Sequence, residues 1–164
     1  MTVTLALAKQ HLRVDSSEED DLIAQYMAAA LVWVEQQTGK KMAVGAVTQI
    51  AVQFGNYIPL LWGPFVSLTS IAYTDTDDAP QTVTAARVRD GRIYAPEAGW
   101  PGIADYTPIV VTYQAGYSTV PAPLDSAQLL LIGEYYDNRE AGVASSAVSA
   151  AVESLCRPYR DCLV

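Results

Sequence analysis

Carboxylates gather at two places in this chain, and clustered carboxylates are the ligands that calcium prefers. One cluster runs from Asp15 to Asp21 and the other from Asp75 to Asp78. A calcium loop of the EF-hand type needs acids at alternate positions, a central glycine and a closing glutamate. The first cluster lacks the glycine, and Ala79 and Pro80 follow the second. We therefore expect no metal site, and interpret the clusters as a helix cap and a solvated turn.

The single histidine, His11, is the natural candidate for a general base. A serine or cysteine hydrolase holds such a base between a nucleophile and an orienting carboxylate. His11 instead follows Lys9 and Gln10 on a polar helix face, and no nucleophile elbow occurs in the sequence. The pattern predicts a surface histidine.

The patterns of a phosphate-binding loop and of a catalytic carboxylate pair are also incomplete. Gly39-Lys40-Lys41 lacks the upstream glycine and the following serine or threonine of a phosphate-binding loop. No spacing selects Glu134 with Glu140, or Glu97 with Asp105, as a catalytic carboxylate pair, so we interpret these acids as solvated charges. The sequence therefore predicts a protein that is not an enzyme, with no catalytic residue, no cofactor and no metal.

Composition restricts the partners of the chain. Its 164 residues carry a formal net charge of −8, and only 17% of them are charged, against about 25% in average soluble domains. A protein that grips nucleic acid by counterion release needs a basic patch, which this balance disfavours. We expect no signal peptide and no membrane span. The spacing of Cys156 and Cys162 fits neither a disulfide framework nor a zinc site, so a reduced cytoplasmic context is expected.

Helical patterns occupy both ends of the chain. A short helix is expected at residues 5–12, with Thr4 as its N-cap. A long helix follows and ends at Gly39, and Ser16 with Glu19 or Ser17 with Asp20 offers it a capping box. A second long helix is expected at residues 123–140 and a last one at 149–157, closed by a proline. Seven consecutive apolar residues, 28–34, and four more, 129–132, cover whole helix turns and indicate neighbours on several sides.

The middle of the chain follows the two-residue period of strands. Strands are expected at residues 47–54, 66–74, 83–88, 92–94 and 109–113, with Asp90-Gly91 as a hairpin turn. Residues 95–108 are expected to form an irregular loop. The sequence thus predicts an α+β fold, in which a helical core from the two terminal segments carries an inserted small antiparallel β lobe. The expected boundaries are 1–43 and 119–164 for the core and 44–118 for the lobe.

Several segments of the two ends resemble head–tail connector (adaptor) proteins of long-tailed bacteriophages and prophages. The similarity lies in residues 7–15, 19–23 and 35–40, then in Val111-Thr112-Tyr113-Gln114-Ala115-Gly116-Tyr117, in Tyr135-Tyr136-Asp137-Asn138-Arg139-Glu140, and in Leu155 to Arg160. It covers roughly the outer half of the chain. The departure is the β lobe, since the smallest connectors of this kind are nearly all helical.

This resemblance implies a structural virion protein in the virion neck, made in the cytoplasm of the bacterial host. Its partners would be itself, in a ring of about a dozen copies, then the portal protein above it and a stopper or tail-completion protein below it. DNA would pass through the ring without specific binding, and no membrane is involved.

The same resemblance assigns roles to particular residues. The portal-docking residues would be Arg157, Tyr159, Arg160 and Leu163, in a tail that is either an arm ordering on its partner or a frayed helix end. The subunit contacts would be Trp33, Tyr135, Tyr136 and Arg139, although a core with a helix cap explains the last three equally well. From the acidic balance we predict that the acids of one cluster or of the other line the ring lumen, and the candidates are Asp15, Glu18, Asp75, Asp77 and Asp78.

Two alternatives remain at the level of the sequence. The proline-rich loop from Tyr94 to Tyr106, with Trp100, suggests a small-molecule or glycan-binding module, because concave aromatic sites bind such ligands. The other alternative is a different neck protein, such as a stopper or a tail terminator, which the helical ends argue against.

Overall fold

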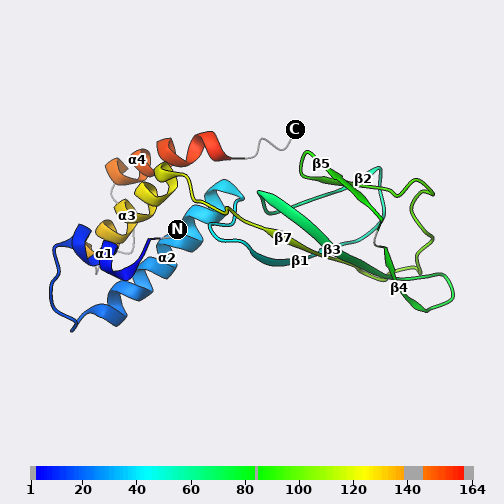
Figure 1. Cartoon of the computed structure of the whole chain (residues 1–164), viewed down its shortest axis with the longest axis horizontal. Coiled ribbons are helices and arrows are strands. Elements are labelled where there is room, and N and C mark those ends of the chain that lie inside the picture. Colours follow the sequence, from blue (N-terminus) through cyan, green and yellow to red (C-terminus); the bar gives the residue numbers. More distant parts are fainter. Residues whose placement is uncertain (1–2, 84, 139–145, 161–164) are drawn as a thin grey trace. The chain divides into compact units, whose positions relative to one another are not determined.

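The computed structural model describes residues 3–83, 85–138 and 146–160 and has a mixed α+β fold, as predicted (Figure 1). The chain divides into two compact units. The helical unit comprises residues 1–43 and 118–164, and the β lobe comprises residues 44–117.

The helical unit contains four α-helices and a 3-10 turn in its described part. They are α1 (Leu5–Leu12), α2 (Asp20–Thr38), α3 (Ala122–Asp137), α4 (Ser146–Cys156) and η1 (Arg157–Tyr159). Helix α3 packs against each of the other three helices. One stripe of α2 enters the interior because apolar residues recur at helical spacing, and the buried residues of α2 and α3 include Ile23, Ala30, Val34, Leu124, Ala127 and Leu131.

The ends of the helices test the predicted caps. The hydroxyl of Thr4 accepts a hydrogen bond from the backbone N–H of Leu7, so the cap of α1 is confirmed. Gly39 closes α2 in the left-handed conformation, also as predicted. The capping boxes were wrong: α2 begins only at Asp20, and its N-cap residue Glu19 makes no capping bond. The carboxylates of Glu19 and Asp20 are instead bound by side chains of other helices.

The β lobe contains two antiparallel sheets. The four-stranded sheet has the order β1 (Gly45–Ala51), β7 (Ile109–Ala115), β3 (Phe65–Thr74) and β4 (Pro80–Val83). The three-stranded sheet has the order β2 (Tyr57–Pro59), β6 (Arg92–Tyr94) and β5 (Arg87–Arg89). Gly45 on β1 pairs with Ala115 on β7, so the chain enters and leaves the lobe on neighbouring strands.

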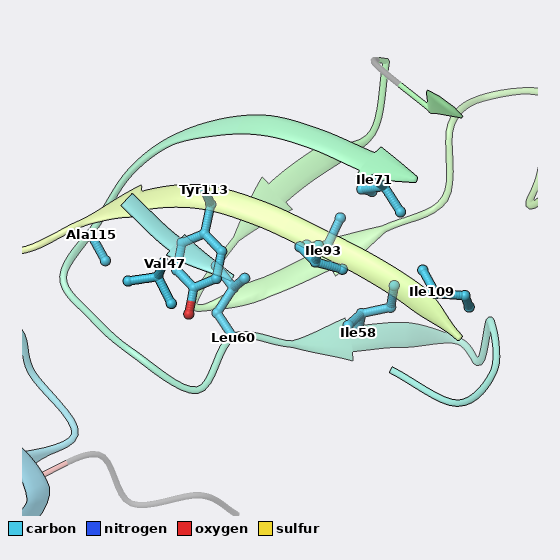
Figure 2. Packing of buried hydrophobic residues seen from close by; sticks show 9 residues of the cluster. Val47, Ile58, Leu60, Ile71, Ile93, Ile109, Tyr113 and Ala115 are labelled. Atoms are coloured by element: carbon cyan, nitrogen blue, oxygen red, sulfur yellow. The ribbon is translucent and has the colours of Figure 1, made fainter. Parts of the chain in front are cut away.

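A single hydrophobic cluster lies between the two sheets. Figure 2 shows Ile71, Ile109 and Tyr113 of the larger sheet beside Ile58 and Ile93 of the smaller one, and all five are almost fully buried. Burying apolar side chains contributes roughly 25 cal/mol per Å² of surface removed from water, so this cluster holds the sheets together.

The strand predictions need two corrections. The strand expected at 83–88 is divided between β4, which ends at Val83, and β5, which begins at Arg87. Strand β2 was missed, because three residues that end in a proline carry almost no periodic signal. The hairpin turn is confirmed: Asp90 and Gly91 both have positive φ, as a type I′ turn requires.

Candidate functional site

Within the described residues, no group of three or more histidine, cysteine, aspartate or glutamate side chains is arranged to hold a metal ion. Their helices also include none that is both long and apolar enough to span a bilayer. His11 is exposed, and its Nε2 lies beside Gly133 of α3, at 3.4 Å from where a Cβ would stand.

In the first acidic cluster, Asp15 to Asp21, some carboxylates face solvent and others contact side chains of other helices. The Lys9 Nζ lies 2.6 Å from the Asp20 carboxylate, which joins α1 to the start of α2. The Tyr136 hydroxyl donates a hydrogen bond to the carboxylate of Glu19, which joins α3 to the same place. Asp15, Glu18 and Asp21 are exposed. The cluster thus combines residues that tie three helices together with carboxylates that face solvent.

The second acidic cluster is organised by Asp75. Its carboxylate accepts hydrogen bonds from the backbone N–H groups of Asp77 (3.0 Å) and Ala79 (2.9 Å) and from the Gln81 side chain (2.9 Å). These bonds, the one from Ala79 foremost, hold the pKa of Asp75 below its ordinary value. Asp77 and Asp78 are exposed at the tip of the turn, so the turn presents two carboxylates on a fixed backbone.

The tyrosines predicted at subunit contacts lie between α3 and α2. The Tyr135 ring is 6.2 Å from the Tyr26 ring, centroid to centroid, and burial raises the pKa of the Tyr135 hydroxyl. Tyr135, Tyr136 and Trp33 are all half-buried. On α2, Val32 remains 49% exposed beside Trp33, and Ala28 and Ala29 are exposed. Arg139, the fourth predicted contact residue, lies outside the described residues.

The predicted portal-docking tail begins as part of the helical unit. Cys156 is a buried free thiol at the end of α4, and burial raises its pKa. Arg160 follows η1, and its guanidinium bonds to the Gln37 side chain at 2.7 Å and the Gln37 carbonyl at 3.1 Å. Arg157 is exposed and Tyr159 is half-buried. Leu163 lies outside the described residues. Helix α3 ends at Asp137, before the expected end at residue 140.

The sequence did not predict that two carboxylates, those of Glu134 and Glu35, are buried. Glu134 was interpreted as a solvated charge, but it is 9% exposed and accepts a hydrogen bond from the Asn138 side chain at 2.9 Å. Glu35 is equally buried, accepts a bond from the Met42 backbone N–H and lies 2.7 Å from Lys41 Nζ. The available signal was their place among apolar residues at helical spacing, which predicts an inward position.

The tryptophan of the loop that suggested a ligand site packs against the lobe instead. The Trp100 ring stacks on Phe54, with centroids 4.6 Å apart and planes 9° from parallel. An open groove of about 490 Å³ lies elsewhere, between β1 and β2, and Gln49, Ile50, Tyr57 and Leu61 are among its lining residues. No residue of the 94–106 loop lines that groove.

Structural comparison finds close likeness along the whole chain. A chain in the neck of an empty gene transfer agent (GTA) particle, computed with C6 symmetry, matches with a TM-score of 0.84 and 25% identity, over 99% of this chain and 91% of that one. A chain in the neck of the native GTA particle, computed with C12 symmetry, matches with a TM-score of 0.77 and 25% identity, over 100% and 96%.

Sequence comparison gives one family and no individual relative. No curated protein matches this sequence. The model of the head completion protein family matches residues 2–153. The chain therefore belongs to the head completion protein family.

Proposed function

We propose that this protein is a head–tail adaptor, which forms a ring in the virion neck, extends the DNA channel below the portal and joins the filled head to the tail. The observation that carries the proposal is the match to neck chains of GTA particles over essentially the whole chain, at a TM-score of 0.84. Membership of a family of head completion proteins agrees with it. The C6 and C12 symmetries of those necks support a closed ring of identical copies.

The partners follow from this place in the neck. The ring would contact the portal protein on one side and a stopper or tail-completion protein on the other, with DNA passing through unbound. The helical unit would form the ring core, and the β lobe would be an addition to it. We assign portal docking to Arg157, Tyr159, Arg160 and Leu163. The exposure of Arg157, one residue beyond α4, supports that assignment.

The subunit contacts would lie on α2 and the end of α3. The apolar turn around Trp33 leaves Val32 half exposed, more apolar surface than an isolated helix face needs. Tyr135, Tyr136 and Arg139 would extend the contact. For the lumen, the sequence offered either acidic cluster, and we retain Asp15 and Glu18, whose carboxylates face solvent. The turn of Asp75, Asp77 and Asp78 is the other candidate, and its exposed acids are also available to a partner.

The competing functions have less support. The family is one of structural virion proteins, which gives an enzymatic role no basis. The ligand-binding alternative depended on an exposed aromatic loop, and its tryptophan packs against Phe54. The match to neck chains includes the helical ends, which favours an adaptor over a stopper or tail terminator.

The direct test is deletion of the gene from its phage or prophage, followed by negative-stain electron microscopy of the induced lysate. We expect separate filled heads and finished tails, and joining restored by the wild-type gene on a plasmid. Normal infectious particles from the deletion strain would overturn the proposal. A plasmid carrying R157E tests the docking assignment, with E153Q on exposed α4 surface as the matched control.

A further inference from the structure

The outer face of the three-stranded sheet carries a surface that the proposed function does not use. Because paired residues of antiparallel strands share a face, the register places Tyr57, Tyr94 and Arg87 in one row across β2, β6 and β5. Pro59, Arg92 and Arg89 form the next row. We call these six residues the arginine–tyrosine face. The alternate residues, such as Ile58 and Ile93, point into the lobe interior.

Contacts within the face hold its side chains in place. The Arg92 guanidinium lies over the Tyr57 ring, 4.7 Å from its centroid, and the Tyr57 and Tyr94 rings are 6.1 Å apart. The side chains of Arg87 and Arg89 are 68% and 82% exposed. Their ion pairs, with Glu97 at 3.8 Å and Asp90 at 3.2 Å, are also exposed and contribute little to stability. The face thus offers two accessible guanidinium groups beside an ordered aromatic pair.

In the β lobe, the basic residues lie on the arginine–tyrosine face, and half of the carboxylates lie in a different place. Arg87, Arg89 and Arg92 are the only basic residues from Val44 to Tyr117, which also contains six carboxylates. Three of those carboxylates belong to the turn between β3 and β4, where Asp75 fixes the backbone and Asp77 and Asp78 are exposed. Figure 1 shows the β4 turn and the β5 hairpin at different ends of the lobe, so the two cannot meet within one chain.

An acidic protein surface suits this face better than DNA does. Nucleic-acid binding by counterion release needs an extended basic patch, whereas the β lobe carries only Arg87, Arg89 and Arg92 and the chain has a net charge of −8. A guanidinium binds a carboxylate through two parallel hydrogen bonds, so a few well-placed carboxylates are enough for a specific contact. Tyrosine and arginine are also the residues that dominate protein–protein contacts.

We propose that the arginine–tyrosine face of one copy binds the acidic turn, Asp75 to Asp78, of the neighbouring copy in the ring. The inference rests on the proposed function, because the ring supplies the neighbour. A contact between two different surfaces of the same chain is the type that closes cyclic rings. Each copy gives its turn to one neighbour and receives the turn of the other.

Complementary charge reversal tests this pairing. One variant is R87E/R89E. The other is D77K/D78N, in which asparagine tolerates the positive φ of 58° at position 78. Each gene is supplied from a plasmid to the deletion strain, alone or together, and joined particles are counted by electron microscopy. D105K, which reverses an exposed loop carboxylate of the same lobe, serves as the control. Unfolding midpoints of the purified variants verify that each one folds.

We expect each variant alone to lower the number of joined particles at least about tenfold, because like charges then face each other at every contact. The two variants together should restore joining. In a ring in which they alternate, each copy forms a contact of native charge with one neighbour and a contact of reversed charge with the other. The D105K control should resemble the wild type. Variants that each join heads to tails normally would overturn the inference while the wild-type plasmid still confirms the adaptor role. Failure of the wild-type plasmid, or normal particles without any copy, would instead overturn the proposed function.

A loss that co-expression does not restore would also overturn the pairing, because the two surfaces would then contact different molecules. DNA is the partner to test in that case. Purified wild-type protein would retard an oligonucleotide in a gel at low salt, and R87E/R89E would not.

Discussion

At the residue scale, Gln49 shows how one polar side chain can join two sheets. It lies on β1 and is 7% exposed. Its amide donates to the Pro59 carbonyl at 2.8 Å, and its oxygen accepts from the Leu61 N–H at 3.0 Å and from the Tyr113 hydroxyl at 3.1 Å. The side chain therefore joins β1 to the end of β2 and to the segment after it by hydrogen bonds, as a backbone–backbone pair would. A buried polar group is stable only with such partners.

Replacing this residue should weaken the lobe. We expect Q49A to lower the free energy of unfolding by about 2–3 kcal/mol, because each polar group left without a partner costs about 1–3 kcal/mol. Urea unfolding followed by circular dichroism measures the loss. Q53A, an exposed glutamine just beyond β1, is the matched control and should change stability by less than about 0.5 kcal/mol. Equal effects of the two substitutions would contradict this role.

Asp75 gives a prediction about pH. Its folded-state pKa lies below the ordinary value, because the charged form accepts the hydrogen bonds of its turn. The stabilisation is therefore complete above the ordinary carboxyl pKa and is lost as pH falls through the depressed one. D75N should be less stable than the wild type at pH 7, and the difference should shrink in acid. Thermal unfolding across the acid range measures this. T76A, in the same turn, should instead follow the wild-type pH dependence in parallel.

At the scale of elements, the sequence predicted the helices and strands whose own residues show a clear hydrophobic period. Helix α2 repeats its apolar residues at helical spacing over five turns, and Ile23, Ala30 and Val34 are all buried as that pattern requires. Strand β2 could not be predicted, since its partner β6 comes more than thirty residues later and only that pairing defines it. The capping boxes were wrong for a related reason: Glu19 has its partner on α3, which is distant in sequence, and Asp20 has its partner on the preceding helix α1.

Adjacent alanines on α2 allow a matched test of this packing. Ala30 is fully buried and faces the other helices, whereas Ala29 is exposed. A30L should reduce the free energy of unfolding by about 1–3 kcal/mol, because a close-packed interior has no room for the added carbon atoms. A29L should remain within about 0.5 kcal/mol of the wild type. A neutral A30L in the same urea titration would show that the α2 stripe is loosely packed.

At the scale of the whole molecule, the sequence predicted the α+β class and the family but could not identify the arginine–tyrosine face. The alternation of Arg87 and Arg89 around Val88 is visible in the sequence. Tyr57 and Tyr94 join that face only through the register of three short strands. The buried Glu35 and Glu134 show the same limit, since charge alone suggested solvent. Proposed surface sites depend on pairing between distant segments, which single-sequence periodicity does not report.

The β lobe should fold without the helical unit. Its hydrophobic cluster draws every member from residues 47–115, and both sheets are completed within the lobe. We expect a fragment of residues 44–117 to show a β-type circular dichroism spectrum and cooperative urea unfolding. The fragment should be only marginally stable, because a domain of this size buries a modest share of its surface. Uncooperative unfolding of the fragment would show that the lobe needs the helices.

The pairing of Gly45 with Ala115 places the first and the last strand of the lobe side by side, so the two chain segments that connect the lobe to the helical unit leave it on neighbouring strands. A chain that enters and leaves a lobe on neighbouring strands can accept longer or shorter loops within that lobe without rerouting the segments outside it. The same strand pair is where a fluorescent protein or an affinity tag would best be grafted to follow neck assembly in living cells.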